Sequence, residues 1–184
     1  MNLANKLTVA RMALIPFFML ALEVGERGLF NGFGLAEARW VAVCIFIIAS
    51  FTDFLDGYIA RKYNLVTDFG KFMDPLADKI LVGAALIYMV RFYDIDAWLP
   101  VLIFSREFII SGFRMVAAGK GTIIAAGFWG KLKTVSQMLM IIVILPSIDN
   151  SIFNVVGIIL IIASAVFTVV SLVEYLWVNR SVFR

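Results

Sequence analysis

Residues 53–78 read DFLDGYIARKYNLVTDFGKFMDPLAD and stand between long runs of Val, Ile, Leu, Phe and Ala. Asp53 and Asp56 are three residues apart, and Asp74 and Asp78 are four residues apart. On a helix, residues at these spacings share one face, so each pair would direct its two carboxylates the same way. A short connector makes the two helices antiparallel neighbours, and the two acidic faces can then converge.

These four carboxylates predict a metal site. If all are ionised they carry a charge of about −4, and a carboxylate near the bilayer core is costly unless it is compensated. Two divalent cations would balance that charge, and oxygen ligands favour Mg²⁺ or Mn²⁺ over zinc. Two such ions form a clamp for phosphoryl transfer. The competing interpretation is that these residues are loop charges at a membrane surface. It does not explain the paired helical register, and we apply it only to Asp68, in the middle of the connector.

The residues beside Asp53 suit an anionic ligand. On a wheel of 100° per residue, Gly57 and Ala60 fall within about 40° of Asp53, where small residues let a bulky group approach the backbone. Arg61 lies about 80° from Asp53 and can hold a diphosphate with its forked N–H groups. We expect Gly70 to end the connector, where the chain must turn tightly.

The composition indicates an integral membrane protein. The 184-residue chain is 62% hydrophobic, whereas a soluble domain is usually about 45–50% apolar. A membrane helix needs about 20 apolar residues. We therefore predict an all-α polytopic membrane protein with six transmembrane helices, in which residues 1–184 form a single catalytic domain. The spans are expected at residues 5–23, 38–62, 71–92, 97–117, 130–147 and 153–178. The chain has no histidine, which disfavours histidine-based catalysis, and its one cysteine cannot form an intrachain disulfide.

The distribution of Lys and Arg predicts the orientation in the membrane. With six spans both termini lie on one side, and 13 of the 16 basic residues lie on or nearest that side. Loops rich in Lys and Arg stay in the cytoplasm, so we expect both termini and the aspartates at the cytoplasmic face. Arg27, Arg39 and Arg91 are the exceptions. The net charge of +3 says little about partners, and no nucleic-acid partner is expected.

The first span opens with NKLTVAR, in which Asn5, Thr8 and Arg11 recur every three residues and form one polar edge. One interpretation is a helix cap followed by an arginine that snorkels to the membrane surface. The other is a nucleotide-binding edge. We favour nucleotide binding for Asn5 and Thr8, and we favour it less for Arg11.

The fourth span contains SREFIISGFR, with Arg106 and Glu107 near its middle, where charges usually mark function. Because these two residues are adjacent, they point about 100° apart, and we expect them to need separate partners. Arg114 lies two turns further on a similar face, and the next span opens with GKLKT, which adds Lys131 and Lys133. Together the four cations can line a pocket for a second anion, such as an acceptor that carries its own phosphate. The alternative for these cations is anchoring at the membrane surface.

The aspartate stretch resembles a known signature. Its pattern is D-x-x-D-G-x-x-A-R, eight further residues, and G-x-x-x-D-x-x-x-D, which is similar to that of the CDP-alcohol phosphotransferases. NxLTxxR at residues 5–11 also resembles the opening of many members of that family. The resemblance implies six transmembrane helices, a homodimer, and two divalent cations bound by Asp53, Asp56, Asp74 and Asp78.

The same resemblance implies a reaction. An alcohol attacks the β-phosphoryl group of a CDP-linked lipid, CMP leaves, and Asp78 doubles as the general base. Gly57, Arg61 and Thr67 match positions that contact the CDP-lipid in such enzymes. The lipid bilayer is then both the solvent of the protein and the source of its substrate.

The motifs REFxxSGxR and GKxKTxxQM are similar to the glycerol-phosphate branch of this family, the phosphatidylglycerophosphate synthases. This softer resemblance implies CDP-diacylglycerol as donor, glycerol 3-phosphate as acceptor, and the cytoplasmic membrane of a bacterium as location. One alternative is another acceptor, namely phosphatidylglycerol, inositol phosphate or serine. Another is a cation transporter that uses the same aspartates, but clustering at one end of the spans rather than at the midplane argues against it.

Overall fold

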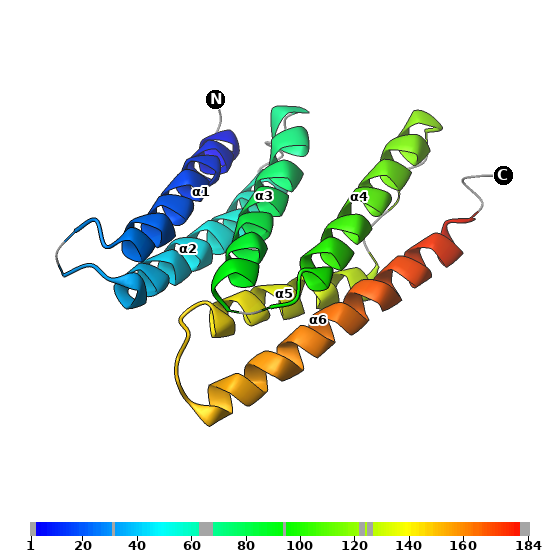
Figure 1. Ribbon diagram of the computed structural model, residues 1–184. Helices are drawn as coiled ribbons and strands as arrows, with labels where there is room; N and C mark the ends of the chain where they lie inside the picture. The colour runs from blue at the N-terminus through cyan, green and yellow to red at the C-terminus, as the bar shows by residue number, and fades with distance from the viewer. Residues whose placement is uncertain are drawn as a thin grey trace. The chain divides into compact units, whose positions relative to one another are not determined.

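The computed structural model describes residues 3–30, 32–62, 68–93, 95–121, 124 and 127–180. Within the helices, the side chains of residues 3–5, 54, 56–62, 68–72, 74 and 75 lie outside this description. The described residues form six helices, α1 Leu3–Arg27, α2 Leu35–Lys62, α3 Asp68–Phe92, α4 Trp98–Gly119, α5 Phe128–Ile144 and α6 Ser151–Val178. These residues contain no strand, and one isolated bridge pairs Phe30 with Phe33. The expected all-α class and the order of the helices are confirmed (Figure 1).

The helix bounds differ from the expected spans by a few residues, and the difference at the start of α3 changes two expectations. This helix begins at Asp68, so Asp68 does not lie in the middle of the connector and Gly70 does not end it. Both expectations are wrong. A carboxylate at the start of a helix interacts favourably with the helix dipole, which favours a start at Asp68. Nearer the C-terminus of the chain, α5 ends at Ile144 rather than at residue 147. Pro146 disfavours helical geometry in Leu145, the residue before it.

The chain divides into two compact units, which we describe separately. Met1–Tyr88 and Leu145–Ser147 form the first unit, and Met89–Ile144 and Ile148–Arg184 form the second. The aspartate signature therefore belongs to the first unit, and the four candidate acceptor cations belong to the second. A single catalytic domain stays a prediction.

In the first unit, α1 and α2 lie side by side (Figure 1). Gly25 of α1 allows this approach, because a Cβ atom there would lie only 2.2 Å from the Cβ of Ala38 in α2. Tyr88 of α3 contacts α1 twice: its hydroxyl donates to the carbonyl oxygen of Met19 at 3.3 Å, and its ring meets Phe18 edge to face. Both helices that carry the aspartates therefore contact α1, and α3 does so through Tyr88.

In the second unit, α6 packs against α4 and α5. Its buried face is formed by small and polar residues and one tyrosine, Gly157, Ser164, Thr168, Ser171 and Tyr175. Its exposed residues are mostly aliphatic, among them Ile158, Ile159, Ile162, Val166, Val169 and Val173. A helix of a soluble protein shows the reverse arrangement, whereas membrane helices pack through small and polar residues. The surface of α6 is therefore typical of a membrane helix.

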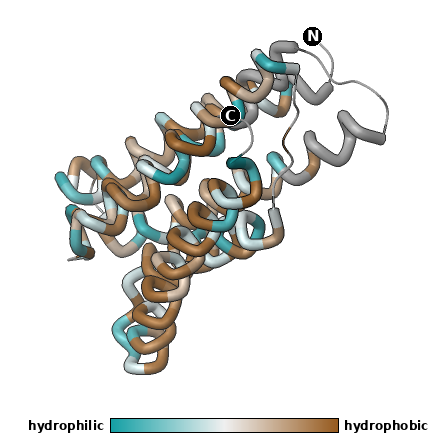
Figure 2. Tube along the Cα trace, turned by 90° about the vertical axis from the view of Figure 1, so that its right-hand side faces the viewer, coloured by the Kyte–Doolittle hydropathy of each residue, from teal (hydrophilic) through white to brown (hydrophobic). Residues whose placement is uncertain are grey.

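Three helical segments within the described residues are long and apolar enough to cross a membrane, namely Lys6–Arg27, Leu35–Asp53 and Ser151–Val178. Exposed apolar side chains also occur on α3, α4 and α5, among them Ile87, Phe108 and Leu139. Figure 2 shows hydrophobic residues, coloured brown, along the described helices. Membrane crossing by all six helices stays a prediction.

Candidate active site

The two aspartate pairs lie on two helices, as the sequence predicts. Asp53 and Asp56 lie in the C-terminal part of α2, and Asp74 and Asp78 lie in the N-terminal half of α3. The helical spacing of each pair is therefore confirmed. The side chains of Asp56 and Asp74 lie outside the described residues, so convergence of all four carboxylates stays a prediction. Among the side chains that are described, no group of three or more acidic or cysteine residues is close enough to hold a metal ion.

Asp53 is held by Arg11 of α1. The Arg11 side chain is buried, with 1% exposed, and its Nη1 atom lies 2.7 Å from Asp53 Oδ1. Its Nε atom donates to the carbonyl oxygen of Ala49, one turn earlier on α2, at 3.3 Å. The two contacts anchor the guanidinium on α2 and place its charge beside the Asp53 carboxylate. Arg11 does not snorkel to the surface, so that alternative is wrong for this residue.

The polar edge of α1 is only partly described. Thr8 is buried, like Arg11, whereas the side chain of Asn5 lies outside the described residues. The repeat every three residues is the sequence signal that places Arg11 on this edge, but it does not name Asp53 as the partner. Nucleotide binding by Asn5 and Thr8 stays a prediction.

The described part of the aspartate signature fits a hard divalent cation. The chain has no histidine, and its one cysteine is a free thiol on α2 outside the signature. The signature therefore offers oxygen donors, which Mg²⁺ and Mn²⁺ prefer. Arg11 compensates the charge of Asp53 while 37% of the Asp53 side chain stays exposed. Asp78 is also partly exposed. Neither carboxylate is sealed in the core, so both can accept a cation.

The residues expected to bind the CDP-lipid lie where α2 ends and α3 begins. Gly57, Ala60 and Arg61 belong to the last two turns of α2, and Gly70 belongs to the first turn of α3. The surroundings of these residues, and Thr67 as a whole, lie outside what the structure describes. Their contacts with the lipid headgroup stay predictions.

A second polar centre surrounds Glu107 of α4. Its Oε1 atom accepts from Arg106 Nη1 at 2.9 Å and from Lys133 Nζ, on α5, at 2.5 Å. Arg106 also donates from Nε to the hydroxyl oxygen of Ser171, on α6, at 3.2 Å. The expectation that Arg106 and Glu107 need separate partners is wrong, because two long side chains on adjacent residues can bend toward each other. Lys133 is buried in this centre, so anchoring at a membrane surface does not describe it.

The other two candidate acceptor cations are exposed. The guanidinium carbon of Arg114 lies 5.7 Å from the centre of the Tyr175 ring, which is a cation–π contact. Lys131 lies in the first turn of α5 and makes no hydrogen bond or ion pair with another described residue. The structure therefore brings Arg106 and Lys133 together, while Arg114 and Lys131 stay accessible to an anion. Binding of one acceptor by all four cations stays a prediction.

Three residues of the second unit make contacts that the sequence did not reveal. The sequence marks Glu107 as a charge in the middle of a predicted span. Its position in the sequence does not show that it bridges Arg106 and Lys133. Ser171 contacts Arg106, and Tyr175 contacts Arg114; these two residues lie four residues apart on α6. This spacing marks one face of a helix. Nothing in the sequence, however, pairs that face with α4.

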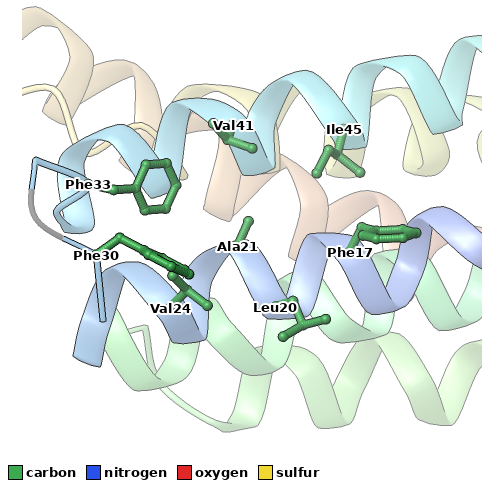
Figure 3. A pocket seen from close by; sticks show the side chains of 8 residues that line it. All are labelled: Phe17, Leu20, Ala21, Val24, Phe30, Phe33, Val41 and Ile45. Atoms are coloured by element: carbon green, nitrogen blue, oxygen red, sulfur yellow. The ribbon is translucent and has the colours of Figure 1, made fainter. Parts of the chain in front are cut away.

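An open apolar groove lies between α1, α2 and their connector (Figure 3). Its volume is about 480 Å³, and it is lined by Phe17, Leu20, Ala21, Val24, Phe30, Phe33, Val41 and Ile45. Ile45 precedes Asp53 by eight residues on α2, which corresponds to about 12 Å along a helix. The groove therefore lies away from the aspartates, and none of these lining side chains can bind a phosphate.

The chain is similar to known proteins along most of its length. A sequence model of the CDP-alcohol phosphatidyltransferases matches residues 1–170. A protein of Bacillus subtilis (strain 168) named CDP-diacylglycerol–glycerol-3-phosphate 3-phosphatidyltransferase is 49% identical over 149 residues, which cover 76% of this chain and 74% of the relative. A protein of the same name from Rickettsia bellii is 40% identical, over 95% of this chain and 93% of the relative. Another from Haemophilus influenzae is 37% identical, over 97% of this chain and 94% of the relative. The chain belongs to the CDP-alcohol phosphatidyltransferase family.

Proposed function

We propose that this chain transfers the phosphatidyl group of CDP-diacylglycerol to glycerol 3-phosphate and releases CMP. The observation that carries the proposal is the identity of 37–49% to relatives named for this reaction, over 76–97% of the chain. The paired cations around Glu107 support an acceptor that carries a phosphate. The product is phosphatidylglycerophosphate, an intermediate of phospholipid synthesis.

Two divalent cations, Mg²⁺ or Mn²⁺, would be held by Asp53, Asp56, Asp74 and Asp78. When bound, such ions neutralise the diphosphate of the donor and stabilise the charge that develops on the departing CMP. The choice of these metals is supported by the oxygen donors of the signature. Arg11 would contribute by placing its positive charge beside one of the four carboxylates, that of Asp53.

In the reaction, a hydroxyl oxygen of glycerol 3-phosphate forms a bond with the β-phosphorus of CDP-diacylglycerol, and the bond from that phosphorus to the CMP oxygen breaks. Asp78 accepts the proton of the attacking hydroxyl as general base. Arg61 binds the diphosphate and stabilises the charge on the leaving CMP. The headgroup of the CDP-lipid would also contact Asn5, Thr8, Gly57, Ala60, Thr67 and Gly70.

The phosphate of the acceptor is assigned to Arg106, Arg114, Lys131 and Lys133. Guanidinium and ammonium groups bind phosphate through charge-assisted hydrogen bonds. Serine carries no phosphate and would give no reason to place Arg106 and Lys133 inside a predicted membrane span, where charge is costly. Inositol phosphate and phosphatidylglycerol do carry a phosphate, so they are the closest alternative acceptors.

We place the protein in the cytoplasmic membrane of a bacterium as a homodimer, with six crossings, both termini in the cytoplasm and the active site at the cytoplasmic leaflet. The whole chain would act as one catalytic domain. The three described segments that are long and apolar enough to cross a membrane support this placement. The position of 13 of the 16 basic residues on or nearest one side supports the orientation.

The proposal is tested by measuring CMP release from CDP-diacylglycerol by the purified protein in detergent micelles. Glycerol 3-phosphate, phosphatidylglycerol, inositol phosphate and serine are supplied one at a time, each with Mg²⁺ and then with an excess of chelator. We expect CMP release with glycerol 3-phosphate and Mg²⁺, and none with the chelator. CMP release that depends on another alcohol, or on none of the four, contradicts the assignment.

A further inference from the structure

The carboxylate of Glu107 joins two cations that come from different helices. Arg106 is its neighbour on α4, and Lys133 belongs to α5. The side chains are 11% exposed for Arg106, 19% for Glu107 and 7% for Lys133. At this burial two cations repel each other strongly unless an anion lies between them. Glu107 supplies that anion and fixes both cationic groups to a single oxygen atom, Oε1.

Arg106 has a second anchor on α6. Its Nε atom donates to Ser171 Oγ at 3.2 Å, and Ser171 Oγ donates its own proton to the carbonyl oxygen of Thr168 at 3.0 Å. A hydroxyl has one proton and two lone pairs. Because the proton of Ser171 is engaged with Thr168, a lone pair of its oxygen is free to accept from Arg106. The guanidinium is therefore held at both Nε and Nη1.

The remaining nitrogen of Arg106, Nη2, is directed toward the start of α5. A Cβ atom placed on Gly130 would lie 3.2 Å from Nη2, so the absence of a side chain at Gly130 keeps the space beside Nη2 open. Nη2 has no hydrogen-bond partner among the described residues. Lys131, an exposed cation, follows Gly130 directly. An anion at this place can accept from Nη2 while the other two nitrogens of the guanidinium stay occupied.

We propose that Glu107 is a positioning residue for the acceptor substrate. It holds Arg106, together with Ser171, so that Nη2 faces the phosphate of the acceptor beside Gly130, and it holds Lys133 in the same centre. This inference rests on the proposed function, because it assigns the acceptor phosphate to Arg106. Glu107 acts through Arg106 and Lys133 and does not touch the substrate.

Positioning and simple charge neutralisation predict opposite effects of Glu107→Gln. If Glu107 only reduced the positive charge, its removal would strengthen the attraction of an anionic acceptor, and the KM for glycerol 3-phosphate would fall. If Glu107 holds Arg106 in place, the guanidinium loses its direction, and that KM rises by about tenfold or more, the effect of losing one well-aligned charged hydrogen bond. In both cases the KM for CDP-diacylglycerol should stay unchanged, because Glu107 acts through Arg106 and Lys133 on the acceptor alone.

Two further variants leave every charged residue in place. They test the inference even if Glu107→Gln does not fold. Ser171→Ala removes the acceptor of the Arg106 Nε bond, together with the bond that the Ser171 hydroxyl donates to the carbonyl oxygen of Thr168. Gly130→Ala adds a methyl group 3.2 Å from Nη2, and alanine favours the helix more than glycine does. Both variants should raise the KM for glycerol 3-phosphate without raising that for CDP-diacylglycerol, and Glu107→Asp should fall between Glu107→Gln and the unchanged protein.

Ser171→Ala and Gly130→Ala each have a matched control in the same unit. Thr168→Val removes a buried hydroxyl of α6 that accepts from Gln137 rather than from Arg106. Gly112→Ala adds a methyl group with no atom within 4 Å. Both controls should leave the two KM values unchanged.

The decisive measurement is the pair of KM values, for glycerol 3-phosphate and for CDP-diacylglycerol, in Ser171→Ala, Gly130→Ala and Glu107→Gln. A selective rise for glycerol 3-phosphate supports positioning. A fall, no change, or an equal rise for both substrates overturns it. If the unchanged protein does not transfer to glycerol 3-phosphate at all, the proposed function fails; if it does and the variants behave like it, only the present inference fails.

Discussion

At the scale of single residues, the two buried cations among the described side chains each contact a carboxylate. Arg11 contacts Asp53, and Lys133 contacts Glu107. Removal of the carboxylate from such a pair leaves a buried cation uncompensated, which destabilises a protein much more than loss of an exposed pair does. Loss of either carboxylate is therefore expected to destabilise the fold, and in the proposed function the same pairs place groups that take part in the reaction.

Arg11→Met is expected to lower the free energy of unfolding by about 1.5–3 kcal/mol, the usual cost of losing a hydrogen bond to a charged group. Thermal unfolding in detergent measures the change. The control is Arg27→Met, which removes the i,i+4 pair of Arg27 with Glu23 on the surface of α1 and should cost no more than about 1 kcal/mol. Equal losses in the two variants would show that the Arg11–Asp53 pair contributes no more than an ordinary surface pair.

The proposed role of general base distinguishes Asp78 from Asp53. Asp78→Asn should abolish CMP release while it weakens CDP-diacylglycerol binding less than Asp53→Asn does, because an amide cannot accept the proton of the attacking hydroxyl. Turnover and equilibrium binding of the CDP-lipid are measured on the same preparations. A turnover in Asp78→Asn equal to that of the unchanged protein refutes the role.

At the scale of helices, close packing depends on residues without bulky side chains. Gly25 of α1 lies against Ala38 of α2, and Gly157 of α6 lies against Ile144 of α5, where an added Cβ would be 3.3 Å from Cγ1. Such contacts let the backbones approach, which is a common way for membrane helices to associate. The α1–α2 contact is the tighter of the two and carries both Arg11 and Asp53.

Gly25→Ala should separate α1 from α2, because its Cβ would lie 2.2 Å from Ala38 Cβ and 2.9 Å from the carbonyl oxygen of Gly34. Backbone atoms cannot rotate away as the end of a side chain can, so we expect a loss of about 1–3 kcal/mol, typical of overpacking. Gly112→Ala, with no atom within 4 Å, should be neutral or stabilising by up to about 1 kcal/mol. Thermal unfolding of the two variants side by side tests this, and an unchanged midpoint for Gly25→Ala would contradict the packing.

The helices were predictable from the sequence, but their contacts were not. Apolar runs long enough for a span, separated by glycines, prolines and charges, give all six described helices, and three-and-four spacing places the aspartates on helices. The buried polar face of α6 shows why the contacts between helices could not be predicted. In a membrane protein, apolar residues cover the outer surface as well as the helix–helix contacts, so an apolar face does not identify a contact. Partners such as Arg11 and Asp53, which are 42 residues apart, depend on the rotation of each helix about its axis, and no spacing in the sequence encodes that rotation.

At the scale of the whole molecule, the residues of the proposed site are divided between the two compact units. The aspartate signature belongs to the first unit, and the Glu107 centre belongs to the second. Each part can be recognised from its own motif, and each is stabilised by contacts within its own unit. The sequence also predicts a common orientation in the membrane for the whole chain, since basic residues gather on one side of the predicted spans.

The orientation is tested by labelling single cysteines in spheroplasts with a maleimide that cannot cross membranes. Cys44→Ala removes the one native cysteine, and Lys120→Cys or Asp149→Cys is then added at an exposed connector position. The Asp149 position should react in intact spheroplasts, and the Lys120 position should react only after lysis, because the predicted topology places the two connectors on opposite sides of the membrane. Cys44→Ala alone should give no label. Labelling of the Lys120 position in intact spheroplasts contradicts the predicted orientation.

The central claim is that four carboxylates from α2 and α3 hold two divalent cations for phosphatidyl transfer. The most direct test is the number of Mn²⁺ ions bound per chain by the purified protein with CDP-diacylglycerol present, obtained from the electron paramagnetic resonance signal of free Mn²⁺. Our account predicts about two ions per chain, the number expected of a two-metal site, and fewer in Asp53→Asn and Asp74→Asn. A protein that forms product at its full rate while it binds no Mn²⁺ or Mg²⁺ would contradict the account.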